Sequence, residues 1–200
     1  MIHKPAITQV AINDTIAKRW SGRAYNPEKM VSHDQLIALV EAARWAPSCF
    51  GDQPWRFIVC NKNTDAQSWQ QGFSCLAESN QLWAKDAPLL LVVCADNLFS
   101  HNLQANRWAQ YDTGAASENL CLQASSMGLM AHQMGGFNAT DARIAFAIPD
   151  QFTLMAIISV GYPADSVSLT PEILSRETAV RKRKPLNELI FASSWGRALD

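Results

Sequence analysis

The chain has almost no net charge and no long apolar run, and both absences exclude classes of function. Its 17 basic and 18 acidic residues leave a formal net charge of −1, so the overall charge does not attract the chain to nucleic acid or to an anionic membrane. The longest apolar run, residues 87–95, is far shorter than the roughly 20 residues of a membrane-spanning helix. We therefore predict a protein that has neither nucleic acid nor a membrane as a partner.

The chain also lacks a disulfide framework and a secretion signal. Its 5 cysteines have no C-x-x-C spacing, which is typical of reduced thiols, and Cys60 and Cys94 end apolar runs as small buried residues would. Residues 1–5 begin no apolar run of signal-peptide length. We expect a cytoplasmic location.

Motifs of several common chemistries are absent as well. The sequence has neither G-x-G-x-x-G nor G-x-x-x-x-G-K-[ST], which argues against the usual dinucleotide and P-loop sites. The 4 histidines form no metal-ligand spacing, and no G-x-S-x-G elbow is present. We assign no metal site and no catalytic side chain, so a bound organic cofactor is the natural source of any demanding chemistry.

What the chain does contain is the composition of one globular domain over residues 1–200. It is 48% hydrophobic, with 7 tryptophans that suggest interface or pocket surface beyond a single core. The patterns predict an α+β protein, an α/β sandwich around one sheet. The expected helices are 11–19, 33–46 after a Ser32–Gln35 capping box, 69–79, 106–127 and a short one capped by Thr140; the expected strands are 57–60, 88–95, 130–133 and 154–161.

Two segments of the chain have an unusual composition. The helix at 106–127 is rich in small residues on several faces, which suggests close packing on more than one side, as at a dimer centre. The segment after Pro171 is basic at 181–184 and then apolar. Such a tail needs a surface to pack on, which is either its own domain or a neighbouring subunit.

Two basic motifs are candidate anion sites. In the run from Lys18 to Arg23, two guanidinium groups flank Ser21 and can grip a phosphate, although a solvated basic stretch has the same composition. The run 181–184 is a solvated stretch, a nuclear signal or nucleic-acid patch, or an extended segment in which Arg181 and Arg183 close on the same phosphate as Arg19. The near-neutral net charge disfavours the nucleic-acid interpretation.

The third motif, residues 43–57, is highly specific. A helix ends at Pro47, a loop of small residues follows, and Gln53-Pro54-Trp55 leads into a strand. Small residues and Gly51 allow the backbone to approach a flat ligand closely. Gln53 offers a donor and an acceptor together, which suits the edge of a heterocycle.

With these motifs the sequence resembles the FMN-dependent nitroreductases over nearly its whole length. Their opening Arg-x-Ser-x-Arg/Lys is matched at 19–23, and their Ala-Pro-Ser-Ser-x-Asn-x-Gln-Pro-Trp at 46–55. Further matches in the right order are found at 80–84, 112–116, 128–129, 135–138, 161–163 and 183–186. The resemblance implies a nitroreductase-like fold, with a central mixed, mainly antiparallel sheet flanked by helices. It also implies a homodimer in which the C-terminal extension, residues 171–200, is exchanged between subunits.

The resemblance implies a role for each matched residue toward FMN. Arg19, Arg181 and Arg183 would hold the phosphate, with Ser21 and Trp20 beside them. Arg23 would lie by the N1–O2 edge, Asn80 by the pyrimidine, and Gln53 by the ribityl or pyrimidine side. The backbone N–H groups of Gly135 and Gly136 would face N5. The cofactor contacts across the dimer interface would come from Pro47, Ser48 and Cys49.

The implied reaction is ping-pong transfer of hydride from NADH or NADPH through flavin N5 to a small-molecule electron acceptor, a nitroaromatic, quinone or similar flat electrophile. Other possibilities are a member specialised for enone or free-flavin reduction and a non-catalytic FMN-storage protein. No motif distinguishes NADH from NADPH. Trp83, Trp108 and Phe99 either line the acceptor site or belong to the core.

Two positions depart from the family pattern. Gly51 stands where an asparagine is usual, which would enlarge or dry the pocket and so affect substrate choice. Cys49 replaces the second serine of the motif, either as a size match or as a redox-sensitive thiol beside the flavin.

Overall fold

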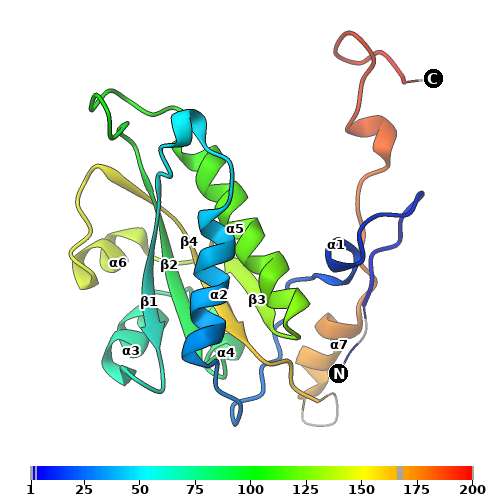
Figure 1. Cartoon of the computed structure of the whole chain (residues 1–200). Helices are drawn as coiled ribbons and strands as arrows, with labels where there is room; N and C mark the ends of the chain where they lie inside the picture. Colours follow the sequence, from blue (N-terminus) through cyan, green and yellow to red (C-terminus); the bar gives the residue numbers. More distant parts are fainter. Residues whose placement is uncertain (1, 3, 166–168, 200) are drawn as a thin grey trace.

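A four-stranded sheet forms the centre of the protein in a computed structural model that describes residues 2, 4–165 and 169–199. The strands are β1 (Trp55–Asn61), β2 (Leu89–Asp96), β3 (Met130–Met134) and β4 (Phe152–Gly161), in the order β1-β2-β4-β3 (Figure 1). The three pairings among these strands are all antiparallel. Within the described part of the chain, β1 and β3 are therefore the edges of this sheet.

The central position of β2 follows from its sequence. Its residues from Leu89 to Ala95 are all buried, because β2 is paired on both sides and covered on both faces. A continuous apolar run is what such a strand requires. A bulge interrupts its register with β4 between Val93 and Cys94.

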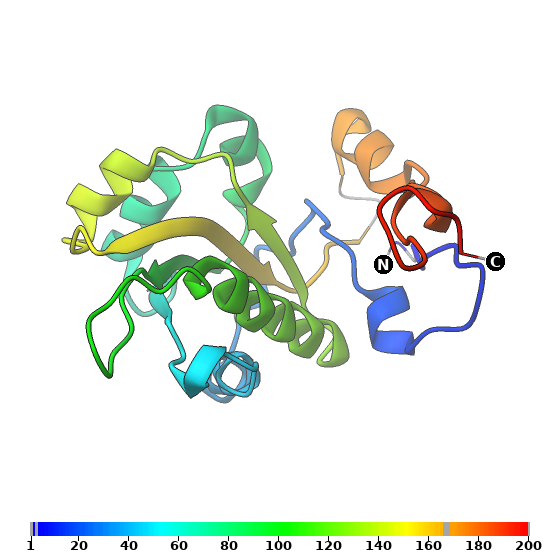
Figure 2. The same ribbon diagram turned by 90° about the horizontal axis from the view of Figure 1, so that it is seen from above.

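Helices cover both faces of the sheet, which confirms the expected sandwich. The helices α2 (His33–Arg44) and α5 (Ala109–Ser126) pack together on one face, against Leu89, Leu91 and Val93. The other face, which carries Leu90 and Val92, is covered by α3 (Ala66–Ser74), α4 (Glu78–Ala84) and α6 (Ala139–Ala145). Figure 2 shows the two helical layers on opposite sides of the sheet.

Local sequence signals predict some boundaries well and others poorly. The Ser32–Gln35 capping box opens α2 as expected. The helix predicted at 69–79 is wrong: α3 ends at Ser74, because Cys75, Leu76 and Ala77 pair through their backbones with residues 136–138. The short helix is capped by Asn138 rather than by Thr140, since the Asn138 side chain accepts hydrogen bonds from two backbone N–H groups of its first turn.

The two ends of the chain form an arm beside the sandwich. The arm contains α1 (Asp14–Lys18), α7 (Pro171–Thr178) and a short 3-10 turn, η3 (Leu186–Glu188) (Figures 1 and 2). Arg181 joins the two ends by donating hydrogen bonds to the carbonyl oxygens of Lys4 and Ala17, each over 3.0 Å. Large apolar side chains of the tail remain exposed in the single chain: Val180, Leu186, Leu189, Ile190, Trp195 and Leu199. No helix among the described residues is both long and apolar enough to cross a membrane.

Candidate cofactor site

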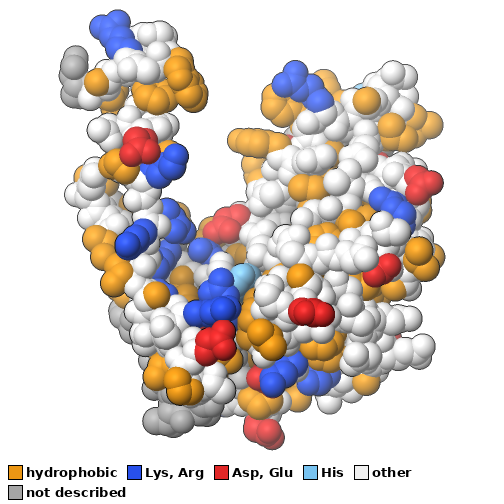
Figure 3. Space-filling view, turned by 180° about the vertical axis from the view of Figure 1, so that it is seen from behind, with side chains coloured by type: hydrophobic (Ala, Val, Ile, Leu, Met, Phe, Trp, Pro, Cys, Tyr) orange, Lys and Arg blue, Asp and Glu red, His pale blue; other side chains and the backbone are white. Residues whose placement is uncertain are grey.

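A hollow lies between the arm and the sandwich (Figure 3). Lys and Arg side chains gather on the side of the arm that faces the sandwich (Figure 3). Part of the hollow is a cavity of about 200 Å³, whose lining includes Lys4, Arg19, Trp20, Met130 and Glu177. Cationic groups beside apolar walls suit a ligand that carries both an anion and a ring.

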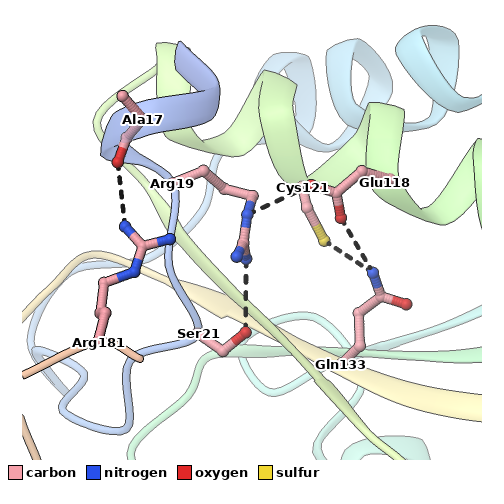
Figure 4. Close-up of polar contacts among 7 residues, drawn as sticks. All are labelled: Ala17, Arg19, Ser21, Glu118, Cys121, Gln133 and Arg181. Atoms are coloured by element: carbon pink, nitrogen blue, oxygen red, sulfur yellow. Dashed lines mark hydrogen bonds and ion pairs between the residues drawn. The ribbon is translucent and has the colours of Figure 1, made fainter. Parts of the chain in front are cut away.

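Arg19 lies at the centre of this basic region. Its Nε lies 3.3 Å from Glu118 Oε1 on α5, and its Nη1 donates to Ser21 Oγ over 3.4 Å (Figure 4). The Arg19 side chain is only 17% exposed, so the guanidinium is held in one orientation. Gln133 on β3 donates toward the second Glu118 oxygen over 3.5 Å, which ties this network to the edge of the sheet (Figure 4).

Arg181 approaches the same region from the C-terminal part of the arm. Burial lowers the pKa of its guanidinium, and the nearby positive charges of Arg19 and Arg183 lower it further. The Arg181 guanidinium thus lies close enough to Arg19 and to Arg183 to be repelled by both, and a bound anion would relieve that repulsion. That Arg181 and Arg183 close on the same phosphate as Arg19 stays a prediction; Arg183 is exposed, and its Nη1 donates to the Lys182 carbonyl over 2.9 Å.

Arg23 extends the site toward α4 and β3. Its guanidinium carbon lies 6.0 Å from the centroid of the Trp83 ring, and the carbonyl of Gly22 accepts a hydrogen bond of 3.0 Å from Nδ1 of His132. Trp83 is itself buried against Tyr25 and His132, so its ring belongs mainly to the core. Burial lowers the pKa of His132 to about 4, so this histidine is neutral at physiological pH.

Asn80 and Gly136, which belong to two separate motifs of the sequence, meet beyond the end of β3. Asn80 Nδ2 donates to the Gly136 carbonyl over 3.0 Å. A Cβ at Gly136 would lie only 3.0 Å from that nitrogen, so glycine permits the close contact. Gly135 and Gly136 are both exposed, which leaves this turn accessible to a ligand.

A second group of predicted residues lies elsewhere. Pro47, Ser48, Cys49 and Gln53 belong to the loop before β1, and β1 is three strand spacings from β3, about 14 Å across the sheet. Within this loop Gln53 donates its backbone N–H to Ser48 Oγ over 3.0 Å. A single chain therefore does not bring the two groups together.

The loop before β1 carries an unusual backbone and an aromatic cluster. Phe50, Gly51 and Gln53 all have positive φ angles, of 55°, 67° and 52°. Gly51 thus occupies backbone that glycine or asparagine adopts most readily, which accounts for glycine at this position. Phe50 is 81% exposed and packs edge-on against Phe99 and His101, with ring centroids 5.7 and 5.5 Å away.

Hydrogen bonds join this loop to the segment that follows β2. Asp52 Oδ1 accepts hydrogen bonds from the backbone N–H and the hydroxyl of Ser100, over 2.9 and 2.6 Å. The sequence indicates Phe99 as a candidate for the acceptor site, but it does not indicate Phe50, His101 or Glu177 as site residues. Each of these depends on contacts between segments far apart in the chain, which no local pattern reveals.

The chain is similar to several known proteins. The chain is 28% identical over 164 residues to a putative NADH dehydrogenase/NAD(P)H nitroreductase of Methanothermobacter thermautotrophicus, which covers 80% of this chain and 81% of that protein. It is 32% identical over 149 residues to an uncharacterized 15.4 kDa protein of Mycolicibacterium smegmatis, with 72% and 99% covered. A crystal structure described as an oxidoreductase containing FMN matches with a TM-score of 0.87 and 30% identity over 96% of both chains.

The family itself is shown by a match over most of the sequence. The sequence model of the Nitroreductase family matches residues 16–162. That range includes Arg19, Ser21 and Arg23, the loop before β1, and the turn at Gly135 and Gly136. The chain therefore belongs to the nitroreductase family.

Proposed function

We propose that this member of the nitroreductase family binds FMN and transfers electrons from NADH or NADPH to a flat electrophilic acceptor. The observation that supports the proposal is the proximity of Arg19 and Arg181, which come from opposite ends of the chain (Figure 4). When bound, FMN would supply the redox chemistry, taking hydride from NAD(P)H at N5 and passing the electrons to a nitroaromatic or quinone in ping-pong order.

The residues of the hollow suit the parts of this cofactor. Arg19, Arg181 and Arg183, with Ser21 and Trp20 beside them, would hold the phosphate through charge-assisted hydrogen bonds. Arg23 would lie by the N1–O2 edge, where a fixed positive charge stabilises the negative charge that reduction produces. Asn80 and the backbone of Gly135 and Gly136 would orient the pyrimidine and N5. No side chain of the protein needs to act as a nucleophile.

The separation of the two residue groups supports a homodimer. Pro47, Ser48, Cys49 and Gln53 would complete the site of the second subunit, because they precede β1, which is at the opposite edge of the sheet from β3. The exposed apolar tail supports the same arrangement, with the extension from Pro171 packing on the partner. Gly114 and Tyr111 lie uncovered on the outer face of α5, which leaves that face free to pack at the dimer centre.

The aromatic cluster supports the choice of acceptor. Phe50, Phe99 and His101 form a set of rings beside Cys49, of which Phe50 and His101 are exposed, and Cys49 would contact the cofactor of the partner subunit. Aromatic rings attract planar ligands by stacking and edge-to-face contact. We infer that these rings border the acceptor position, which favours flat nitroaromatic or quinone substrates.

The visible absorption spectrum of the purified protein tests the proposal first. We expect a flavin band that bleaches on anaerobic addition of NADH or NADPH and returns when a nitroaromatic or quinone is added. A bound flavin that NAD(P)H does not bleach would favour FMN storage. Reoxidation by an enone or by free FMN alone would indicate a specialised reductase. A protein that cannot be reconstituted with FMN would overturn the proposal.

A further inference from the structure

In the hollow, the C=O and the N–H of one peptide unit are both hydrogen-bonded to side chains. The carbonyl of Gly22 accepts a hydrogen bond of 3.0 Å from His132 Nδ1, and the N–H of Arg23 donates to Glu177 Oε1 over 3.0 Å. Both groups belong to the Gly22–Arg23 peptide. Its two partners come from β3 and α7, so the sandwich and the arm meet at this peptide.

The surroundings of Gly22 leave no room for a side chain at this position. A Cβ at this position would clash with Met130 Sδ and would lie 3.1 Å from Glu177 Oε2 and 3.2 Å from the Trp20 ring. The absence of a side chain therefore lets β3 and α7 close on the backbone from both sides. The two hydrogen bonds thus hold the peptide plane from opposite sides.

Glu177 is an unusual residue for such a position. It is only 1% exposed, and burial raises the pKa of its carboxyl, whereas the Arg23 N–H and the charges of Arg23 and Lys4 act in the opposite direction. Burying a carboxylate is costly, and an apolar residue of similar size would fill the same space more cheaply. The site chemistry proposed above gives this carboxylate no other task.

His132 completes the arrangement from the opposite side. Since a carbonyl only accepts hydrogen bonds, Nδ1 must carry the proton, and the neutral tautomer with Nδ1–H meets this requirement. The ring lies 4.7 Å from the Trp83 ring, which limits its rotation. His132 is therefore a fixed donor aimed at the Gly22 carbonyl.

We propose that Glu177 and His132 are positioning residues for the cofactor site: they hold the Gly22–Arg23 peptide and thereby set the direction in which the Arg23 side chain leaves the backbone. Neither residue has to touch the cofactor. The inference rests on the proposed FMN binding. The proposal gives α7 a role in the site, because the packing of α7 brings Glu177 to the Gly22–Arg23 peptide.

The first test measures the FMN dissociation constant and the flavin reduction potential of the full-length protein and its variants. For Glu177→Ala we expect FMN binding weakened about tenfold or more, since the Arg23 N–H loses a buried acceptor. We also expect a more negative potential, since Arg23 no longer faces the reduced edge. Glu177→Gln keeps an acceptor oxygen and should restore both values to near those of the wild type.

Controls separate positioning from folding. Glu172→Ala removes an exposed carboxylate from the same helix, where it pairs with Arg176 over 3.0 Å, and should change neither quantity. His132→Ala should reproduce the effect of Glu177→Ala, and it carries the test if Glu177→Ala does not fold. Wild-type binding that both alanine variants preserve would overturn the inference, as would equal losses in Glu177→Ala and Glu177→Gln. Absence of FMN binding by the wild type would instead overturn the proposed function.

Discussion

Cys49 donates its backbone N–H to Asp112 Oδ2 over 2.9 Å, which ties the loop before β1 to the first turn of α5. Asp112 is only 5% exposed. The loop has three residues at positive φ, so its conformation needs support from outside the loop. The buried carboxylate provides that support at the residue that leads into the strained turn.

Replacing Asp112 tests this dependence. We expect Asp112→Ala to lower the free energy of unfolding by about 1–3 kcal/mol, because the Cys49 N–H loses its acceptor. Asp112→Asn keeps an oxygen at the same position and should cost less. Urea denaturation of both variants gives the comparison. Equal stabilities of the two variants would show that this hydrogen bond does not support the loop.

The basic segment of the arm provides a second prediction. Arg181→Ala and Arg183→Ala should each weaken FMN binding about tenfold or more, because each removes a charge-assisted contact to the phosphate. Lys182→Ala is the matched control: it removes an exposed cation from the same segment without touching the site. Fluorescence titration with FMN measures all three. Unchanged FMN affinity together with a loss of salt-sensitive duplex binding would favour the nucleic-acid interpretation of this segment.

The sequence predicts those features that local chemistry determines. The Ser32–Gln35 capping box and the apolar β2 need only neighbouring residues, and both are confirmed. The end of α3 before Cys75 cannot be predicted in this way. It results from backbone pairing of residues 75–77 with residues 136–138, and the helical spacing of apolar residues in the sequence continues past it.

The same distinction applies to the site. Arg19, Ser21 and Arg23 stand in one short motif and could be named from the sequence. The residues that hold this motif in place could not, because Glu177 lies 154 residues from its partner Arg23 and His132 lies 110 residues from Gly22. Only the tertiary fold shows that Glu177, rather than another acid of the basic tail, is buried against the motif.

The aromatic cluster predicts a substitution that weakens activity without lowering stability. Phe50 holds a left-handed backbone, which costs a non-glycine residue roughly 1–2 kcal/mol. Phe50→Gly should therefore leave the thermal stability unchanged or raised. It should also raise KM for a nitroaromatic acceptor several-fold, because the exposed ring is removed, without changing the affinity for FMN. Steady-state kinetics and thermal melts test this. An unchanged KM would show that Phe50 does not border the acceptor.

The buried histidine gives a prediction for pH. Folding lowers the pKa of His132 from 6.5 to about 4, chiefly because burial disfavours the charged ring. Between these values the unfolded chain binds a proton that the folded chain does not, so this contribution to stability is complete above 6.5 and falls as the pH falls toward 4. For the wild type we expect His132 to account for a loss of about 2 kcal/mol between about pH 7.5 and about pH 5.

The contribution of Glu177 to stability has the opposite pH dependence. Burial raises the pKa of its carboxyl, so this residue favours the folded state below pH 4.5, and the contribution is lost as the pH rises. The two residues are separated by measuring urea denaturation at several pH values for His132→Gln and Glu177→Gln. His132→Gln should lose less stability on acidification than the wild type, and Glu177→Gln should lose more. His33→Gln, which changes an exposed histidine at the start of α2, serves as the control and should follow the wild type. If the free energy of unfolding of His132→Gln fell with pH as steeply as that of the wild type, the His132 ring would be accessible to protons in the folded protein. In that case the Gly22 carbonyl would not depend on a neutral donor, and the fixed direction of the Gly22–Arg23 peptide would need another cause.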